Sequence, residues 1–207
     1  MRDYPKMPRV RYKRAVFIDR DGTINRDTHY PYKLEDLFII PGAVAGLKIL
    51  SSLVLDIIVI SNQGGIALQL FTKEDMSGFN DELRKRVEKA GARIDAFYYC
   101  PHFERKNLPR CQEACSCSKP APGMLLEAAK DYQIDLSRSF LIGDRNSDIA
   151  AGLAVNCITL LVMSGAIEKN NCDRDCKPDY IENSLYEAAI RIKSCLEAEE
   201  SDPAVNK

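Results

Sequence analysis

The sequence predicts an α/β fold built on a doubly wound, Rossmann-like parallel sheet with helices on both faces. Three observations support this prediction. Short apolar segments alternate along the chain with patterns typical of amphipathic helices. The alternation of strand and helix patterns repeats, as successive βαβ units require. Polar side chains follow several of the apolar segments directly, and ligands bind at that edge of such sheets.

The predicted strands are short, mostly apolar runs. They lack the polar alternation of a half-exposed strand, so each is expected to be buried on both faces of the sheet. The predicted strands are residues 15–18, 55–60, 94–99, 139–142 and 157–162.

The clearest predicted helix covers residues 72–91, where Thr72 is the expected N-cap and Gly91 the expected end. Its apolar residues recur every three or four positions at Met76, Phe79, Leu83 and Val87. This spacing places them on one face of a helix. Further helices are expected at 41–53, 122–133, 146–155 and 183–200.

We predict a single domain over residues 1–207, with its core at about 14–165 and a C-terminal helix and charged tail at 183–207. Hydrophobic residues make up 45% and charged residues 29% of the chain, which is ordinary for a soluble globular protein. No apolar run approaches the roughly 20 residues that span a bilayer. The basic N-terminal segment has no apolar run typical of a secretory signal, so a cytoplasmic protein is expected.

The charge balance bears on the class of ligand. With 29 basic and 30 acidic residues, no overall positive field favours nucleic acid. No membrane partner is expected either, and we predict a small-molecule substrate. The oligomeric state is left open.

Two carboxylates, Asp19 and Asp21, stand where the first predicted strand ends. Carboxylates this close repel each other and stay ionised together only if a cation neutralises them. Mg²⁺ suits this position because it binds oxygen ligands from carboxylates, phosphates and water. Gly22 would let the backbone turn sharply there. Taken alone, an Asp-x-Asp-Gly segment is also typical of an ordinary turn.

Three further polar clusters are expected at the same sheet edge. Ser61 and Asn62 follow the second predicted strand, and Lys119 precedes a helix that begins with proline. Asp144 follows the fourth predicted strand, with Asp148 one helical turn later. The ends of parallel strands meet at one edge, so the clusters should converge on one crevice. Singly, Ser61 and Asn62 also fit a turn, and Lys119 an exposed charge. Asp148 fits a first-turn helix acid, which places it behind the reacting groups at most.

The cysteines suggest a second metal site. A Cys-x-His pattern is followed by Cys-x-Cys, and thiolate and imidazole ligands in such a set suit tetrahedral zinc. Four protein ligands leave no open position, so we predict a structural Zn²⁺ site that fixes the loop 100–117; unliganded thiols in a surface loop are the alternative. The predicted ligands are Cys100, His102, Cys115 and Cys117.

The other cysteines have weaker assignments. Cys111 is a rival ligand inside the same loop, Cys157 is expected in the core, and Cys195 is expected to pack on the last helix. Cys172 and Cys176 are expected to have either weak metal affinity or no role.

In order along the chain, "DRDGTIN", "SNQGGIA", "YYCPH", "CSCSKPAPGMLL" and "IGDRNSD" resemble the haloacid dehalogenase-like phosphatases, over essentially residues 14–162. The zinc loop narrows the resemblance to the small, capless branch that contains heptose bisphosphate and histidinol-phosphate phosphatases. The resemblance implies that Asp19 is a nucleophile that forms an aspartyl-phosphate and that Asp21 is the general acid/base. It implies Mg²⁺ bound by Asp19, Asp144 and the main-chain carbonyl of Asp21. Ser61 and Lys119 would bind phosphoryl oxygens.

The resemblance also implies where the substrate binds. The stretch between Asp19 and Ser61 already contains a helix and leaves no room for a cap domain, so substrate selection falls to the loop 26–36 and the zinc loop. The implied substrate contacts are Asp27, Thr28, His29, Tyr30, Asn62, Gln63, Gly64, Ser118 and Arg145. His29 also fits an exposed turn.

Two positions depart from the pattern of the heptose enzymes. Ser118 stands where arginine usually precedes the lysine, and Leu68 where arginine usually follows "GIA". Arginine binds an anion through two parallel hydrogen bonds, which serine cannot reproduce. Both departures leave the phosphoryl chemistry intact and bear on the choice of substrate.

We therefore expect a Mg²⁺-dependent phosphomonoesterase that hydrolyses a sugar phosphate, foremost the 7-phosphate of D-glycero-D-manno-heptose 1,7-bisphosphate. Histidinol phosphate or another small phosphate ester is the alternative substrate. A non-catalytic, zinc-stapled interaction module is a third hypothesis from another class. It would require one of the reacting residues Asp19, Asp21, Lys119 or Asp144 to be missing, and all are present.

Overall fold

The computed structural model describes residues 13–103, 115–165 and 176–201. It contains one sheet of parallel strands in the order β3-β2-β1-β4-β5-β6, with every neighbouring pair parallel. The strands are β1 (Ala15–Asp19), β2 (Asp56–Asn62), β3 (Ala96–Cys100), β4 (Phe140–Gly143), β5 (Ile158–Val162) and β6 (Tyr180–Glu182). The predicted fold class is confirmed.

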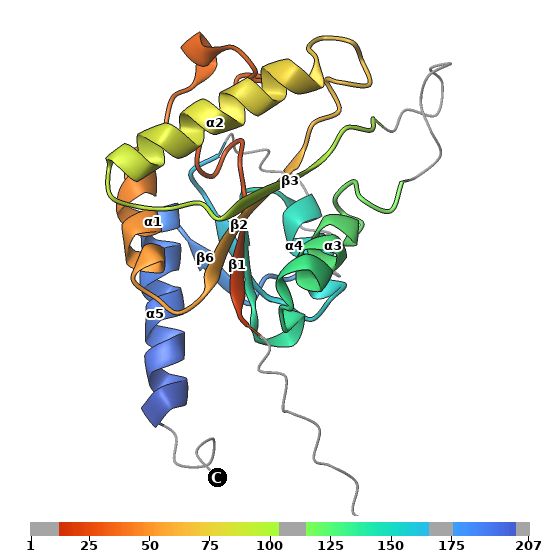
Figure 1. Cartoon of the computed structure of the whole chain (residues 1–207). Coiled ribbons are helices and arrows are strands. Elements are labelled where there is room, and N and C mark those ends of the chain that lie inside the picture. The colour runs from red at the N-terminus through yellow and green to blue at the C-terminus, as the bar shows by residue number, and fades with distance from the viewer. Residues whose placement is uncertain (1–12, 104–114, 166–175, 202–207) are drawn as a thin grey trace, which may run out of the picture.

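Helices cover both faces of the sheet (Figure 1). They are α1 (Ala43–Ser51), α2 (Lys73–Lys89), α3 (Gly123–Tyr132), α4 (Asn146–Leu153) and α5 (Leu185–Ser201), with short 3-10 helices η1 (Leu34–Asp36) and η2 (Leu136–Arg138). The α2 helix begins as predicted, because the Thr72 side chain accepts a hydrogen bond from the backbone N–H of Asp75. Gly91 follows its end with a φ of 84°.

The core has two halves, one on each face of the sheet. Val16 and Ile18 of β1 pack with α1, α2 and α5, whereas Ala15 and Phe17 face α3 and α4. Successive residues of a strand point to opposite faces, so a strand buried on both faces must be apolar at every position. This explains the continuous apolar runs in the sequence.

One strand differs from the prediction. Residues 164–182 showed only a polar, irregular pattern, but β6 pairs with β5 at the edge of the sheet. The α5 helix then packs against α1. The C-terminal part of the chain therefore contributes to the same core as the first strands.

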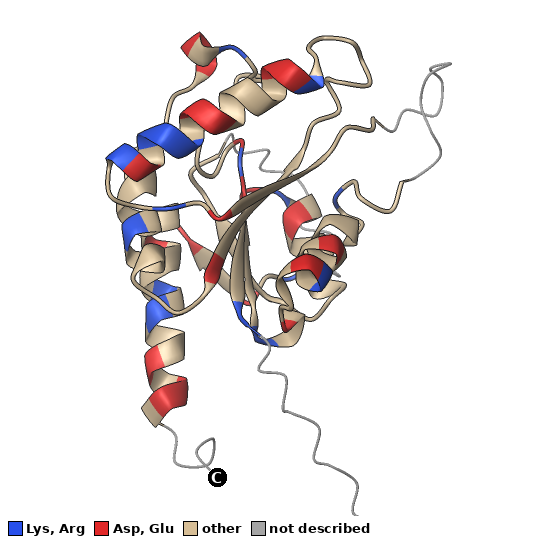
Figure 2. Cartoon of the chain, in the orientation of Figure 1, with Lys and Arg blue, Asp and Glu red and all other residues tan. Residues whose placement is uncertain are grey.

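Between β1 and β2 the chain forms only η1 and α1, so no cap domain is inserted there. The segment after β1 folds back on itself, with backbone hydrogen bonds from Arg26 to Phe38 and from Ile40 to Ile24. The surface helices α2 and α5 carry both acidic and basic residues (Figure 2). Among the described residues, no helix combines the length and the apolar character that crossing a membrane requires.

Candidate active site

The site is a cleft of about 510 Å³ at the carboxyl ends of the central strands. The topology explains its place: the chain leaves β1 toward β2 on one side and returns to β4 on the other, which opens a crevice where the strand order reverses. Residues lining the cleft include Asp19, Asp21, Asp27, His29, Tyr30, Ser61, Asn62, Gln63, Gly64, Ser118, Lys119, Arg145 and Asp148. The sequence analysis named all of these. Pro31, His102, Phe103 and Ser147 also line the cleft, whereas Thr28 does not and is exposed.

Lys119 lies at the floor of the cleft and is buried. Its Nζ lies 2.5 Å from Asp19 Oδ1, 2.6 Å from Asp148 Oδ1 and 3.1 Å from the carbonyl oxygen of Ile60. Burial disfavours the ammonium, but the carboxylates of Asp148 and Asp19 outweigh it and raise the pKa of Lys119. Lys119 is therefore a fixed positive charge and not an exposed one.

Asp148 has a larger role than its sequence position indicated. It is a first-turn helix acid, as predicted, because its Oδ2 accepts the backbone N–H of Arg145 at 3.1 Å. It is also 1% exposed and forms the second ion pair of Lys119, so it belongs to the same buried cluster of charges as Asp19 and Lys119. The helix α4 turns the carboxylate toward the sheet, and the sequence pattern alone does not show this.

The surroundings of the Asp144 carboxylate give the strongest indication that the site binds a metal ion. Both carboxylate oxygens are buried, and neither has a hydrogen-bond partner in the part of the chain that the structure describes. Carboxylate oxygens of Asp19, Asp144 and Asp148 lie within 4.8 Å of one another, as a shared cation requires. Burial, with the nearby charge of Asp148, raises the pKa of Asp144 to about 7. Burial also raises the pKa of Asp19, against the attraction of Lys119. A hard divalent cation would bind the Asp144 oxygens and would neutralise the negative charge of the three carboxylates.

Two glycines make room for the Asp144 carboxylate. A Cβ atom at Gly22 would lie 2.1 Å from Asp144 Oδ2, and one at Gly165 would lie 2.0 Å from it. Gly22 also has a φ of 101°, as the predicted sharp turn after β1 requires. Any larger residue at either position would displace the carboxylate.

Asp21 faces the cleft but stands outside this cluster, because its carboxylate is held by other side chains. Arg20 donates two hydrogen bonds to it, from Nε to Oδ1 at 2.9 Å and from Nη2 to Oδ2 at 2.7 Å. Gln63 Nε2 lies 3.2 Å from Oδ2 and also donates to Ser61 Oγ at 2.7 Å. The sequence analysis did not identify Arg20, which is fully buried.

Asn62 positions Lys119 through the backbone. Its side chain donates to the carbonyl of Lys119 and accepts from the N–H of Lys119, both at 3.0 Å. An asparagine at the end of β2 thus fixes a segment that follows it by 57 residues. Ser61 and Asn62 are therefore more than a strand-end turn.

The mouth of the cleft is formed by the segment after β1. Arg145 Nη2 lies 2.6 Å from Asp27 Oδ2, which links this segment to the start of α4. His29 and Tyr30 both adopt positive φ angles, 64° and 63°, and both line the cleft. Non-glycine residues in this region are uncommon and cluster at functional sites. His29 is exposed and lies in a bend of the chain at the mouth of the cleft, so its contact with a substrate stays a prediction.

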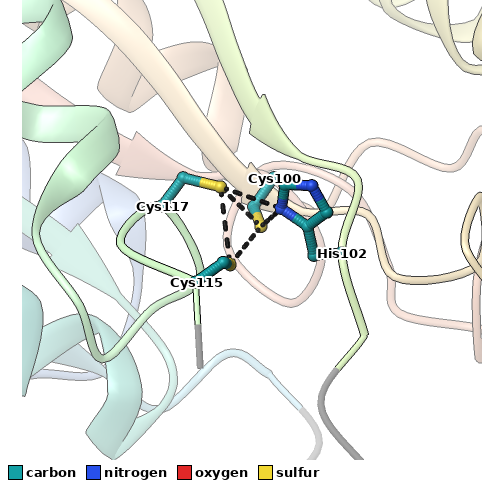
Figure 3. Close-up of side chains that lie close together, drawn as sticks. All are labelled: Cys100, His102, Cys115 and Cys117. Atoms are coloured by element: carbon teal, nitrogen blue, oxygen red, sulfur yellow. Dashed lines mark hydrogen bonds between the residues drawn. The ribbon is translucent and has the colours of Figure 1, made fainter. Parts of the chain in front are cut away.

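The predicted zinc ligands come together in space (Figure 3). Cys100 Sγ lies 3.4 Å from Cys115 Sγ and 2.9 Å from Cys117 Sγ, and His102 Nδ1 lies 3.3 Å from Cys117 Sγ. These separations are longer than a disulfide bond of about 2.05 Å, so these sulfurs are not joined to one another by disulfides. Around zinc, with Zn–S bonds of about 2.3 Å, ligand atoms lie at comparable separations, so the four residues fit the ion.

This cysteine and histidine cluster borders the cleft. The N–H of Ser118 donates to Cys115 Sγ at 3.2 Å, and the N–H of Gln63 donates to the carbonyl of Cys100 at 2.7 Å. His102 itself lines the cleft. A metal at the cluster would thus hold two segments of the cleft wall in place.

The remaining cysteines are placed as follows. Cys157 is buried in the core as predicted, just before β5, and Cys195 on α5 is half-buried near the Tyr180 hydroxyl. Cys176 is buried and contacts the carbonyl of Asn146. Cys111 and Cys172 lie outside the described residues.

Comparisons with known proteins find phosphatases that are similar to this chain. A model of the HAD-hydrolase-like family matches residues 116–188. D-glycero-beta-D-manno-heptose-1,7-bisphosphate 7-phosphatase of Yersinia pestis is 32% identical over 181 residues, which cover 87% of this chain and 95% of that protein. D-glycero-alpha-D-manno-heptose-1,7-bisphosphate 7-phosphatase of Photorhabdus laumondii is 38% identical over 139 residues, 67% of this chain and 76% of that protein.

A solved structure shares the fold. The D,D-heptose 1,7-bisphosphate phosphatase from B. bronchiseptica, crystallised with magnesium and phosphate, matches with a TM-score of 0.76 and 24% identity. The match covers 87% of this chain and 98% of that one. At this identity it shows that the two chains have the same architecture.

Proposed function

The chain belongs to the haloacid dehalogenase-like phosphatases, in the family of the D-glycero-D-manno-heptose 1,7-bisphosphate 7-phosphatases, and on that premise we propose that it releases phosphate from a sugar phosphate through an aspartyl-phosphate at Asp19. One observation carries the proposal. Asp19, Asp144 and Asp148 present oxygens within 4.8 Å of one another beside the Lys119 ammonium, and Asp19, Asp148 and Lys119 line the cleft.

In the first step, an Asp19 oxygen attacks the phosphorus atom of the bound ester. A new O–P bond forms as the bond between phosphorus and the sugar oxygen breaks, and the proton on Asp21 passes to that leaving oxygen. Asp19, Asp144 and the main-chain carbonyl of Asp21 would hold Mg²⁺, which would supply positive charge to the phosphoryl oxygens. The free oxygens of Asp144 support this binding site.

In the second step, Asp21 removes a proton from a water molecule that attacks the same phosphorus atom. The O–P bond to Asp19 breaks, phosphate leaves, and Asp21 is again protonated for the next turnover. One residue thus acts first as an acid and then as a base, which is why it must face the cleft without binding the metal through its side chain.

Ser61 and Lys119 are proposed to bind phosphoryl oxygens. Ser61 Oγ accepts a hydrogen bond from Gln63, so its own O–H is available to donate to the phosphoryl group. Each of the three N–H groups of Lys119 has an acceptor within 3.1 Å. Lys119 must therefore exchange one contact when substrate binds, and Asp19 is the partner that the metal and phosphorus engage instead.

The substrate is proposed to be D-glycero-D-manno-heptose 1,7-bisphosphate, cleaved at its 7-phosphate, because the relatives with that name align over most of the chain. Ser118 lines the cleft, but Leu68 does not, so only the departure at Ser118 bears directly on the bound substrate. Arg145 is already paired with Asp27. Serine in place of the usual arginine and the pairing of Arg145 both weaken the case for a second phosphate on the substrate, so histidinol phosphate or another small monophosphate ester is the second candidate.

The test is a screen of phosphate release, with Mg²⁺ present, over heptose 1,7-bisphosphate, histidinol phosphate and simple sugar phosphates. We expect the heptose bisphosphate to be hydrolysed fastest. Asp19→Asn should abolish turnover, and Asp81→Asn, an exposed acid on α2, should not. Full turnover by Asp19→Asn would refute the nucleophile, and equally slow rates on all esters would refute the substrate.

We also propose that Cys100, His102, Cys115 and Cys117 bind a structural Zn²⁺, and that the protein is cytoplasmic, where its thiols stay reduced. The geometry of the cluster and the absence of disulfides among the described cysteines support the zinc site. A bound zinc ion would fix the segments that carry Gln63 and Ser118.

A further inference from the structure

Arg20 is the largest fully buried side chain among the described residues, and the mechanism above gives it no role. In the chain it lies between Asp19 and Asp21, and of these two carboxylates its guanidinium is hydrogen-bonded to that of Asp21. A buried charge is costly unless it is paired and hydrogen-bonded, so its partners indicate why it is there.

The guanidinium is held on several sides. Nη1 donates to Asn80 Oδ1 of α2 at 2.9 Å, and Nη2 donates to the carbonyl of Pro31 at 3.0 Å. The Phe79 ring lies against it, with the Arg20 Cζ 4.6 Å from the ring centroid. Arg20 therefore has one orientation, set by α2 and by the segment that forms the mouth of the cleft.

The fixed guanidinium of Arg20 determines where the Asp21 carboxylate points. Arg20 occupies one lone pair on each Asp21 oxygen, at 2.9 and 2.7 Å. The remaining contacts, from Asn25 at 3.5 Å and from Gln63 at 3.2 Å, are longer and so weaker. These are the positions that a substrate oxygen or a water molecule can take over without moving the carboxylate.

We propose that Arg20 is a positioning residue, which holds the Asp21 carboxylate toward the cleft for both proton transfers. The inference rests on the proposed function, because it assumes that Asp21 is the acid and the base. Pro31 and Asp21 share one Nη2 group, so the guanidinium also ties the mouth of the cleft to the proton-transfer group.

The test uses two esters that differ in their need for an acid. A sugar phosphate has a poor leaving group that must be protonated, whereas p-nitrophenyl phosphate loses p-nitrophenolate as an anion without a proton. Both esters require Asp21 as a base in the second step. Misplacing Asp21 should therefore slow both steps for the sugar phosphate but only the second step for the aryl ester.

For Arg20→Gln we expect sugar phosphate turnover to fall by about 100-fold or more, the range of general acid–base catalysis. With p-nitrophenyl phosphate we expect a burst of close to one p-nitrophenolate per chain, followed by a steady rate reduced by a similar factor. Arg20→Lys keeps the positive charge but cannot make the two parallel hydrogen bonds, so it should recover part of the turnover that Arg20→Gln loses. Arg84→Gln is the matched control, because Arg84 also stacks on an aromatic ring, Phe97, away from the cleft.

If Arg20→Gln does not fold, Asn80→Ala serves instead, since it removes the Nη1 acceptor and leaves the two hydrogen bonds from Arg20 to Asp21 in place, although it also removes the contact between Asn80 Nδ2 and Met76 Sδ. We expect it to lower sugar phosphate turnover between about twofold and tenfold, with the same burst. Equal losses on both esters without a burst, in either folded variant, would overturn the inference, as would unchanged turnover.

Asp21→Asn separates this failure from that of the proposed function. If the wild-type protein releases no phosphate from any ester, the proposed function fails. If wild type turns over and Asp21→Asn produces the burst but the Arg20 and Asn80 variants do not, only the inference about Arg20 is wrong.

Discussion

Removing magnesium should change how the stability of the protein depends on pH, and Asp144 provides the reason. In the metal-free site, burial and the charge of Asp148 raise the pKa of Asp144 from 3.8 to about 7. The folded chain then binds a proton that the unfolded chain releases between about pH 4 and 7. Stability from this group is complete below its unfolded pKa and is lost as the pH rises through about 7.

The size of the effect follows from the same shift. A displacement of the pKa from 3.8 to about 7 corresponds to about 4 kcal/mol of unfolding free energy. Raising the pH from about 5.5 to 8 should remove roughly half of it, about 2 kcal/mol, because about half of the shift lies in that interval. Mg²⁺ replaces the proton, so it should stabilise the protein more at pH 8 than at pH 5.5.

The assay is urea unfolding at both pH values, with and without Mg²⁺, after dialysis that leaves tightly bound zinc in place. Asp144→Asn is the control: it cannot titrate, so the stabilisation by Mg²⁺ should become weak and nearly independent of pH. A Mg²⁺ effect that is equal at both pH values in the wild type, or larger at pH 5.5, would refute this account of the carboxylate cluster.

Three further predictions concern the two metal sites and the substrate. Gly165→Ala should weaken Mg²⁺ binding by about tenfold or more in a titration, because its Cβ would lie 2.0 Å from Asp144 Oδ2. Gly78→Ala on α2 is the control, because nothing lies within 4 Å of a Cβ atom there, and it should leave the affinity unchanged. Equal Mg²⁺ affinities of the two variants would contradict the proposed cluster. Ser118→Arg should lower the KM for heptose bisphosphate more than the KM for a monophosphate, because arginine can bind a second phosphate. Equal changes in the two KM values would argue against Ser118 facing the substrate. Metal analysis should find about one zinc per chain, lost in Cys117→Ser but kept in Cys195→Ser, and zinc-free protein purified under reducing conditions would exclude the site.

The sequence predicted the central part of the fold well, because each buried strand must be apolar along its whole length. The predicted strand at 139–142 and the helix at 146–155 agree with β4 and α4 within two residues. The strand β6 was missed since it is only three residues long and its Ile181 is 62% exposed. Its pairing with β5 depends on contacts distant in sequence, which a local pattern does not contain.

The site was predictable where it depends on strand ends. Asp19 and Ser61 lie at the carboxyl ends of β1 and β2, and Asp144 directly follows β4 in the same parallel sheet, so topology alone brings them together. Arg20 was not identified and Asp148 was placed only behind the reacting groups, because the surroundings of both depend on burial and on partners such as Asn80 and Lys119 far along the chain. The available signal for Arg20 was its position between two aspartates directly after a buried strand.

The most direct test of the central claim is to locate the covalent intermediate. The Asp21→Asn variant, supplied with p-nitrophenyl phosphate and Mg²⁺, should accumulate the phosphorylated enzyme, because the first step needs no acid and the second has lost its base. Borohydride reduces an aspartyl-phosphate to homoserine, which peptide mass spectrometry can place in the sequence. We expect homoserine at residue 19 and only when both the ester and Mg²⁺ are present. A burst of p-nitrophenolate with Asp19 unmodified, or with homoserine at another aspartate, would contradict the account.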